Sequence, residues 1–141
     1  MRHGTRSRSL RKAHFIALIL VAIALCAAAI QPGCLSINSR NYKSEIAGTK
    51  AVISFDSLNG KRTETIVLKE PAALLNVDAN CGSGVLEVIV ASPDGAALAQ
   101  FTLREKESTK IERLGPYPQG PYAVHLVAQS ATNARITIVF W

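Results

Sequence analysis

The sequence predicts an all-β fold: a single antiparallel β-sandwich, Ig-like or jelly-roll, with about eight strands, after an N-terminal signal segment. From residue 49 onward, apolar and polar residues alternate in short runs rich in Val, Ile, Thr and aromatic residues. Gly, Pro, Asn and Asp separate these runs, and no run has the period of an amphipathic helix. A chain of 141 residues can bury one core of this kind but not two.

Three segments follow one another along the chain: a signal segment (1–33), a tether (34–48) and the sandwich domain (49–141). The signal segment opens with five basic residues and no acidic one, and then runs through sixteen apolar residues, Phe15 to Ile30. Basic residues hold such a segment at the anionic cytoplasmic face while the apolar run enters the export machinery. We therefore expect the domain to work outside the cytoplasm.

The basic excess of the chain belongs largely to the signal segment. The chain has 16 Lys and Arg against 10 Asp and Glu, and without the signal segment eleven basic residues face the same ten acidic ones. The domain is therefore nearly neutral, and it has no basic stripe with interleaved aromatic residues. We expect no nucleic-acid partner.

The signal segment ends in Gln31-Pro32-Gly33 and is followed by Cys34. Gly33-Cys34 resembles the end of the lipobox of bacterial lipoproteins, in which the Cys thiol receives a diacylglycerol. The resemblance implies a lipid on Cys34, the membrane as a partner, and a location on the extracytoplasmic face of the cell membrane or envelope. Gln31 and Pro32 depart from the usual lipobox residues, so two alternatives stay open. Cleavage after Ala29 would give a secreted protein, and without cleavage the apolar run would be a membrane anchor.

The processing of the segment decides whether Cys81 has a partner. If Cys34 is lipidated, Cys81 is the only thiol of the mature domain. If cleavage follows Ala29, Cys34 and Cys81 can pair in an oxidising compartment. Such a bridge would close a loop of about 47 residues and stabilise the domain by roughly 4 kcal/mol. Alone, Cys81 is expected to be a structural residue beside a turn.

Residues 34–48 lose the apolar pattern and are interpreted as a tether. About 15 flexible residues have a reach on the order of 20 Å, which would hold a domain clear of lipid headgroups. The alternative is that Tyr42 to Ala47 forms an extra edge strand.

The first half of the domain is predicted to alternate strands with tight turns. The first strand turns inward Ala51, Ile53 and Phe55. Asn59-Gly60 predicts a two-residue hairpin, after which Ile66 and Leu68 begin the return face, and Pro71 ends the strand. The next strand turns inward Ala73, Leu75 and Val77.

A buried central strand is predicted from Val85 to Ala91, because this run is apolar throughout. Pro93-Asp94-Gly95 then turns the chain. The following strand turns inward Ala97, Ala99, Phe101 and Leu103. The charged stretch from Arg104 to Glu107 suits an exposed edge, and the proline-rich stretch from Leu114 to Pro121 predicts a rigid connection.

Two strands separated by a turn at Ser130 to Asn133 are predicted to complete the sandwich. The first turns inward Tyr122, Val124, Leu126 and Ala128. The second turns inward Ile136, Ile138 and Phe140.

Three short motifs occur in a fixed order between Phe55 and Phe140: Ser83-Gly84-Val85-Leu86-Glu87-Val88, Ser92-Pro93-Asp94-Gly95 and Gly120-Pro121-Tyr122-Ala123-Val124-His125-Leu126. Their succession is similar to that of bacterial extracellular β-sandwiches, which include pre-peptidase C-terminal type modules and small cell-envelope lipoproteins. The resemblance implies an accessory or binding sandwich, not a catalyst. Some of these relatives bind calcium through clustered acidic loops, whereas Asp78 and Asp94 are isolated in this sequence.

No motif of a known catalytic or metal site is present in the domain, so we expect no catalytic residues, no metal and no cofactor. His125 lies between Val124 and Leu126 on the polar face of its strand, which is typical of a solvated residue. Its pairing with Cys81, or two acidic residues within hydrogen-bond reach in a cleft, would favour a hydrolase.

Exposed apolar and aromatic residues are more informative about binding than charged residues. Tyr117, Tyr122 and Trp141 are the candidate ligand surface, an aromatic platform for a glycan or a Pro-rich peptide; the alternative for Tyr122 is a buried residue at its strand entrance. The apolar residues that fall on outward faces are Val52, Leu74, Ile89, Val127, Val139 and Trp141. As one patch they would form a docking surface, and the alternative is that a loop or the tether covers them.

The sequence thus predicts a non-catalytic, lipid-anchored cell-envelope protein that acts as a binding or accessory β-sandwich, with an envelope protein or a glycan as ligand. The alternative is a soluble secreted module that binds carbohydrate or protein and carries a Cys34–Cys81 disulfide.

Overall fold

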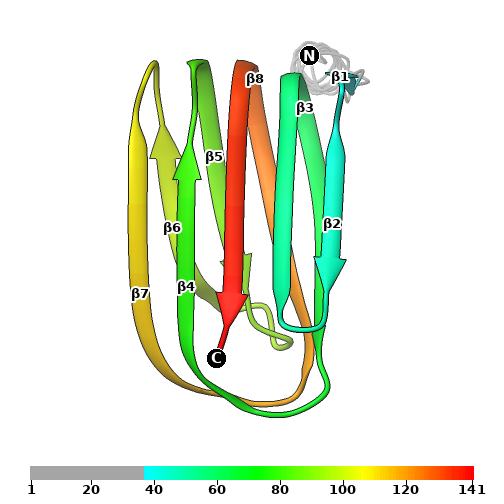
Figure 1. The fold of residues 1–141 in the computed structure, drawn as a ribbon, viewed down its shortest axis with the longest axis vertical. Coiled ribbons are helices and arrows are strands. Elements are labelled where there is room, and N and C mark those ends of the chain that lie inside the picture. The colour runs from blue at the N-terminus through cyan, green and yellow to red at the C-terminus, as the bar shows by residue number, and fades with distance from the viewer. Residues whose placement is uncertain (1–36) are drawn as a thin grey trace, which may run out of the picture. The chain divides into compact units, whose positions relative to one another are not determined.

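A computed structural model describes residues 37–141, and the expectations for the signal segment and for Cys34 lie outside it. The fold is all-β, and every strand pair in this part of the chain is antiparallel (Figure 1). Residues 37–141 contain no helix with the length and hydropathy of a membrane span. The strands are β1 (Asn38–Arg40), β2 (Lys43–Ala47), β3 (Lys50–Leu68), β4 (Ala72–Asn80), β5 (Ser83–Ala91), β6 (Ala97–Leu103), β7 (Ser108–Tyr117) and β8 (Gly120–Phe140).

The two longest strands, β3 and β8, pair with each other along nearly their whole lengths. The first half of β3 pairs with the second half of β8, from Lys50↔Val139 to Leu58↔Ala131. The second half of β3 pairs with the first half of β8, ending at Leu68↔Gly120. Both strands therefore belong to both layers of the sandwich.

The remaining strands extend this pair into two sheets. In the front sheet of Figure 1 the order is β2, the first half of β3, the second half of β8, β4 and β7. In the back sheet the order is the second half of β3, the first half of β8, β5 and β6. The predicted antiparallel sandwich is thus confirmed, with β3 and β8 passing from one sheet to the other.

The two predicted turns at Asn59-Gly60 and Ser130–Asn133 were wrong. In the structure they lie opposite each other where β3 and β8 pass between the sheets, and neither reverses the chain. Gly60, Ser130 and Asn133 have positive φ angles, and β8 carries one extra residue between the partners of Leu58 and Gly60. The Ser130 amide also donates a hydrogen bond to the Asn59 side-chain oxygen at 3.2 Å. The turn-forming residues therefore bend the strand pair, as a β-bulge does.

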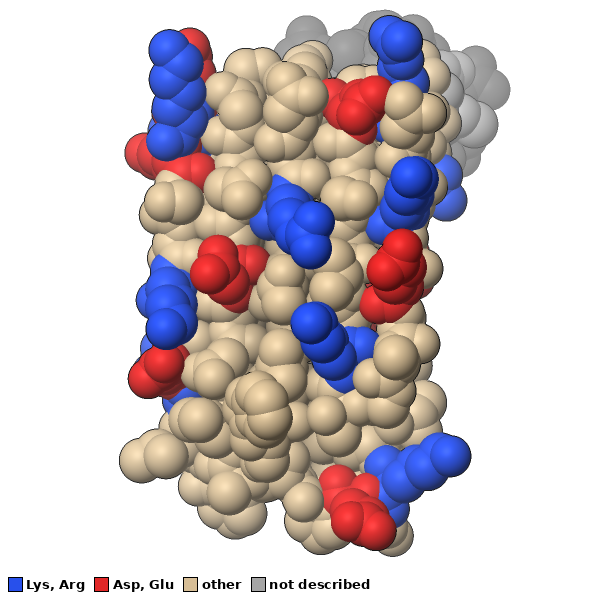
Figure 2. All heavy atoms as spheres, in the orientation of Figure 1, with Lys and Arg blue, Asp and Glu red and all other residues tan. Residues whose placement is uncertain are grey.

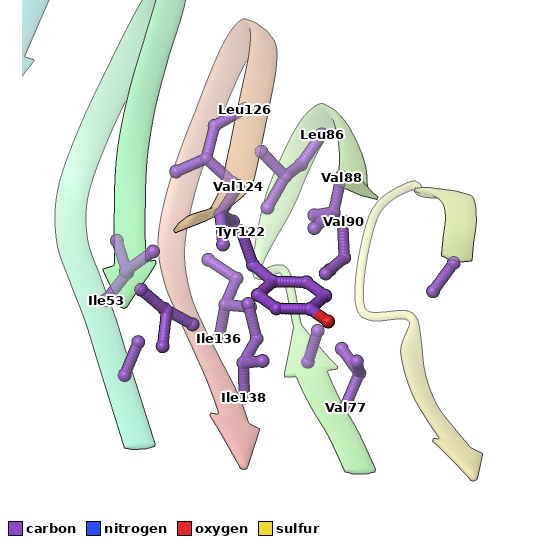
Figure 3. Close-up of a cluster of buried hydrophobic side chains, with 14 of the residues drawn as sticks. Ile53, Val77, Leu86, Val88, Val90, Tyr122, Val124, Leu126, Ile136 and Ile138 are labelled. Carbon is purple, nitrogen blue, oxygen red and sulfur yellow. The ribbon is translucent and has the colours of Figure 1, made fainter. Parts of the chain in front are cut away.

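The core lies between the two sheets and is filled mainly by aliphatic residues. Figure 3 shows Ile53, Val77, Ile136 and Ile138 of the front sheet facing side chains of the back sheet. The residues they face are Leu86, Val88, Val90, Tyr122, Val124 and Leu126. No polar or charged residue in the described part is fully buried. Hydrophobic burial is therefore the main source of stability in this domain.

The predicted inward faces are confirmed with two exceptions next to bulges. Ala73 is exposed and Ala72 is buried in its place, because the register with β7 shifts between Ala72 and Leu74. Ala97 is exposed beside a similar shift between β5 and β6. Because side chains alternate with period 2, one extra residue moves its neighbours to the other face.

Strand β7 was not predicted, although it forms one edge of the front sheet. The stretch from Arg104 to Glu107, which was predicted to be the edge, forms the turn before β7 instead. Part of the predicted rigid connection belongs to β7, because Leu114 pairs with Leu74 and Tyr117 pairs with Ala72. The sequence of β7 lacks a clear alternation of apolar and polar residues, because β7 is an edge strand and is exposed along most of its length. Its Lys and Glu residues and its proline are typical of protected edges.

The segment predicted as a tether contains β1 and β2, so the alternative of an edge strand describes residues 43–47. Tyr42, between these strands, stacks on Phe55 with ring centroids 6.2 Å apart and donates a hydrogen bond to Glu64 at 2.7 Å. The Arg62 guanidinium lies 5.0 Å from the centre of the Tyr42 ring. Burial, together with the hydrogen bond to Glu64, raises the pKa of Tyr42. Tyr42 thereby fastens this segment to both halves of β3.

Substitution of two glycines can distinguish the energetic cost of backbone strain from the cost of a steric overlap. Gly84 and Gly95 both have positive φ angles, but a Cβ on Gly84 would overlap the Ser130 carbonyl, whereas nothing lies within 4 Å of one on Gly95. We expect Gly95→Ala to lower the free energy of unfolding by about 1 kcal/mol. Gly84→Ala should cost about 1–3 kcal/mol more, because β5 must move away from β8. Urea titration of the two variants measures the difference, and equal losses would contradict this close approach.

Candidate functional site

Two of the three predicted ligand-surface residues are buried. Tyr117 is 5% exposed and Tyr122 is 0% exposed, and both pack against Phe140, with ring centroids 5.5 and 4.8 Å away. Each hydroxyl donates to a backbone carbonyl four residues earlier, Tyr117 to Arg113 at 2.9 Å and Tyr122 to Pro118 at 2.7 Å. Burial raises the pKa of both phenols. The proposed aromatic platform at Tyr117 and Tyr122 was therefore wrong, and the alternative of a buried Tyr122 is confirmed.

Trp141, the third residue, is 70% exposed and lies in an apolar row. Its backbone is hydrogen-bonded in both directions to Leu74, at 2.9 and 3.1 Å. Leu74 in turn pairs with Leu114, which is 85% exposed. These three residues, from β4, β7 and the end of β8, form a row about 10 Å wide across the front sheet. We call it the Trp141 row.

The Trp141 row lies where the surface lacks charge. Figure 2 shows the front sheet dotted with charged side chains, except toward its lower left, over the ends of β4, β7 and β8. Val139 extends the row, because it is two residues before Trp141 and half-buried on the same face. Two further exposed hydrophobic residues, Ile46 and Val67, lie near the same end of the sandwich, on other strands. Exposed apolar side chains are thus concentrated at one end of the described domain.

The outward apolar residues predicted alongside Trp141 are less accessible than Trp141 itself. Val52, Leu74, Ile89, Val127 and Val139 are all half-buried by their neighbours. Neither predicted reading therefore holds for the whole set: the sheets shield most of these residues, and a continuous apolar surface forms only around Trp141. Sequence reasoning missed Leu114 because β7 was not recognised as a strand.

The groups considered for a hydrolase do not meet. The His125 Nδ1 is hydrogen-bonded to the Thr63 hydroxyl at 3.0 Å, on the outer face of the back sheet. Cys81 is 2% exposed, and its thiol donates to the Ser83 carbonyl at 3.1 Å. Burial raises the pKa of Cys81, which disfavours the reactive thiolate. Within residues 37–141 no three His, Cys, Asp or Glu residues are grouped as metal ligands.

Comparison with known proteins gives likenesses of low similarity. No protein-family model matches the chain, and no curated protein matches it. Among solved structures it is similar to TmCBM61 in complex with beta-1,4-galactotriose, with 11% identity over 74% of this chain and 86% of that one, at a TM-score of 0.43.

Two other similar structures have related names. "CBM4 structure and function" matches with 10% identity over 78% of this chain and 81% of that one, at a TM-score of 0.41. CsCBM6-3 from Clostridium stercorarium in complex with cellobiose matches with 17% identity over 79% and 90%, at a TM-score of 0.36. Likenesses at this level carry no argument about the ligand of this chain.

The buried thiol makes a direct prediction. In the native full chain we expect iodoacetamide to label Cys81 only as fast as the domain opens, because the thiol is enclosed and its pKa is raised. In urea above the unfolding midpoint, labelling should reach the rate of an ordinary cysteine. Mass spectrometry of the peptide that contains Cys81 measures both rates. Fast native labelling would show that the Cys81 site is open.

Proposed function

We propose that this chain is a non-catalytic cell-envelope protein, anchored through a lipid on Cys34, whose β-sandwich binds an envelope protein or glycan through the Trp141 row. The observation that carries the proposal is the row itself: an exposed Trp and two Leu residues, adjacent across three strands and free of charge. Large apolar side chains grouped on a surface are typical of binding sites.

The size of the row supports a contact of useful strength. Fully burying a Leu side chain is worth about 1.5–3 kcal/mol, and an aromatic residue adds a large contact area with few rotatable bonds. The backbone of Trp141 is fixed by two hydrogen bonds to Leu74, so little backbone conformational entropy is lost on binding. A partner that covers the whole row would therefore gain several kcal/mol, about the contribution of a small hot spot.

The two ends of the domain fit an anchored protein. Ser39 of β1 lies beside Leu58 and thus near Ala131, ten residues before Trp141 on the same strand. Ten residues of strand span about 33 Å, so the chain enters the sandwich at the end opposite the Trp141 row, as Figure 1 shows for β1 and the C-terminus. An anchor on Cys34 would leave the row available to a partner away from the bilayer. The diacylglycerol of a lipoprotein supplies two chains, which stable anchoring requires.

The alternative is a secreted module with a Cys34–Cys81 disulfide. The structure offers less support for it, because Cys81 is buried and its thiol is hydrogen-bonded to the backbone. A bridge would replace the hydrogen bond from this thiol to the Ser83 carbonyl. For this reason we favour the lipid anchor.

Anchoring is tested by changing Cys34. We expect Cys34→Ser to leave the chain as an unprocessed precursor, since the lipid acceptor is gone, while the unaltered protein is processed and partitions into the membrane fraction. Intact mass and metabolic labelling with a fatty acid measure both effects. Cys26→Ser, a matched change within the signal segment, should leave processing unchanged. Normal processing of Cys34→Ser would contradict lipidation, and a mature chain that starts at Ile30 would support the secreted alternative.

Binding through the Trp141 row is tested in the producing cells. A photo-reactive phenylalanine analogue at position 141 should form a discrete adduct, which Leu114→Ser should weaken because it removes the most exposed side chain of the row. The same analogue at exposed Lys61, on the back sheet, is the control position. Leu114→Ser should change the free energy of unfolding by no more than about 0.5 kcal/mol, as surface substitutions usually do.

A glycan ligand has a separate readout, because Trp141 is the only tryptophan of the chain. Purified peptidoglycan sacculi should shift Trp141 emission to shorter wavelength and protect it from iodide quenching if they cover the ring. Adducts that form equally at positions 61 and 141, or that survive Leu114→Ser, together with unchanged emission, would contradict a binding role for the row.

A further inference from the structure

A second surface feature lies on the front sheet, at the end where the chain enters the sandwich. It is a shallow hollow of about 460 Å³. Its rim is formed by Asn41, Lys43, Asn133 and Arg135, and Ser54 and Asp56 also line it. The hollow thus combines two cations and one carboxylate with hydroxyl and amide groups.

The strand register places the two cations on either side of one serine. Lys43 on β2 is opposite Ser54 on β3, and Ser54 is opposite Arg135 on β8. Across three neighbouring strands the backbones of Lys43 and Arg135 are about 10 Å apart. Both side chains are long enough to reach a group held above Ser54. Figure 2 shows blue side chains on either side of uncharged surface in the upper half of this face.

Neither cation is neutralised by a neighbouring carboxylate. Among residues 37–141 the only ion pair joins Lys110 to Glu112, on β7. Asp56, the carboxylate inside the hollow, accepts a hydrogen bond from the Asn41 side-chain amide. Glu45 and Asp78 lie on the same face, in the next row of the sheet, without forming an ion pair. Both cations therefore lack an ion-pair partner among residues 37–141, and the hollow they line also contains one carboxylate, that of Asp56.

We propose that this hollow binds a phosphate group, with Lys43 and Arg135 as its ligands, and that the phosphate is that of an anionic phospholipid headgroup. A guanidinium can bind two phosphate oxygens at once, and an ammonium adds a mobile positive charge. The Ser54 hydroxyl between them can donate a further hydrogen bond.

The choice of phospholipid rests on the proposed anchoring at Cys34, whereas the phosphate site itself does not. Asn41 is the seventh residue after Cys34, and an extended chain of this length spans at most about 25 Å. With Cys34 held at the membrane, the hollow stays within reach of the headgroups. Their binding would hold this end of the front sheet at the bilayer, with the Trp141 row at the far end of the same sheet face.

The test uses competitive acetylation of lysines in the full chain, reconstituted in nanodiscs. Lys43 is the reporter, and Lys50, exposed on the same face but outside the hollow, is the internal control. We expect nanodiscs that contain phosphatidylglycerol to slow acetylation of Lys43 several-fold relative to Lys50, compared with nanodiscs of phosphatidylcholine alone. Arg135→Gln should remove most of this protection, and the matched change Lys61→Gln should retain it.

A second experiment with a soluble phosphate compound distinguishes the phosphate site itself from the proposal that a phospholipid supplies the phosphate. In neutral detergent, glycerol phosphate should also protect Lys43, and Arg135→Gln should abolish that effect. Protection by glycerol phosphate without protection by phosphatidylglycerol would overturn the phospholipid source, while anchoring is judged separately by the processing of Cys34→Ser. Equal protection of Lys43 and Lys50, or protection that survives Arg135→Gln, would overturn the site. Urea midpoints of Arg135→Gln and Lys61→Gln confirm that both variants fold.

Discussion

The structure depends on the antiparallel pairing of β3 with β8, which continues through the bend between the two sheets. Each of these strands supplies residues to both inner faces, so one strand pair holds the two layers together without a disulfide between them. The bend requires positive φ angles at Gly60, Ser130 and Asn133, which glycine, serine and asparagine adopt more easily than branched residues. In the described domain β1 and β2 pair with β3, β4 and β5 pair with β8, and β7 and β6 are added beyond β4 and β5.

The same pairing determines which surfaces remain exposed. The bend brings β1 and the entering chain to one end of the sandwich, and it leaves Trp141 beside Leu74 at the other. Two chemically different surfaces thus occupy opposite ends of one sheet face, a cationic hollow near Ser54 and an apolar row around Trp141. Neither surface contributes to the core, so each can change without loss of the fold.

Much of the fold could be predicted from the sequence because burial imposes period 2 on the strands. The inward faces around Ile53, Val88 and Ile138 follow this rule. Asn59-Gly60 misled because a positive φ angle is a local property, whereas reversal of the chain depends on which distant strand pairs next. Edge strand β7 buries few side chains, so its sequence has no clear alternation of apolar and polar residues. Leu114 was missed for the same reason. Alternation placed Tyr122 on an inward face, whereas the burial of Tyr117 depends on Phe140, which no short-range pattern connects to it.

The position of β8 in the chain has a consequence for folding during the export that we propose. β8 lies at the centre of both sheets, where it pairs with β3, β4 and β5, yet it is synthesised after all of them. Until it is present, β3 and β5 lack their main partner, and β4 and β5 have no strand to join them to β3. The domain therefore cannot close early, and a chain threaded through a membrane N-terminus first would stay extended until nearly all of it had crossed.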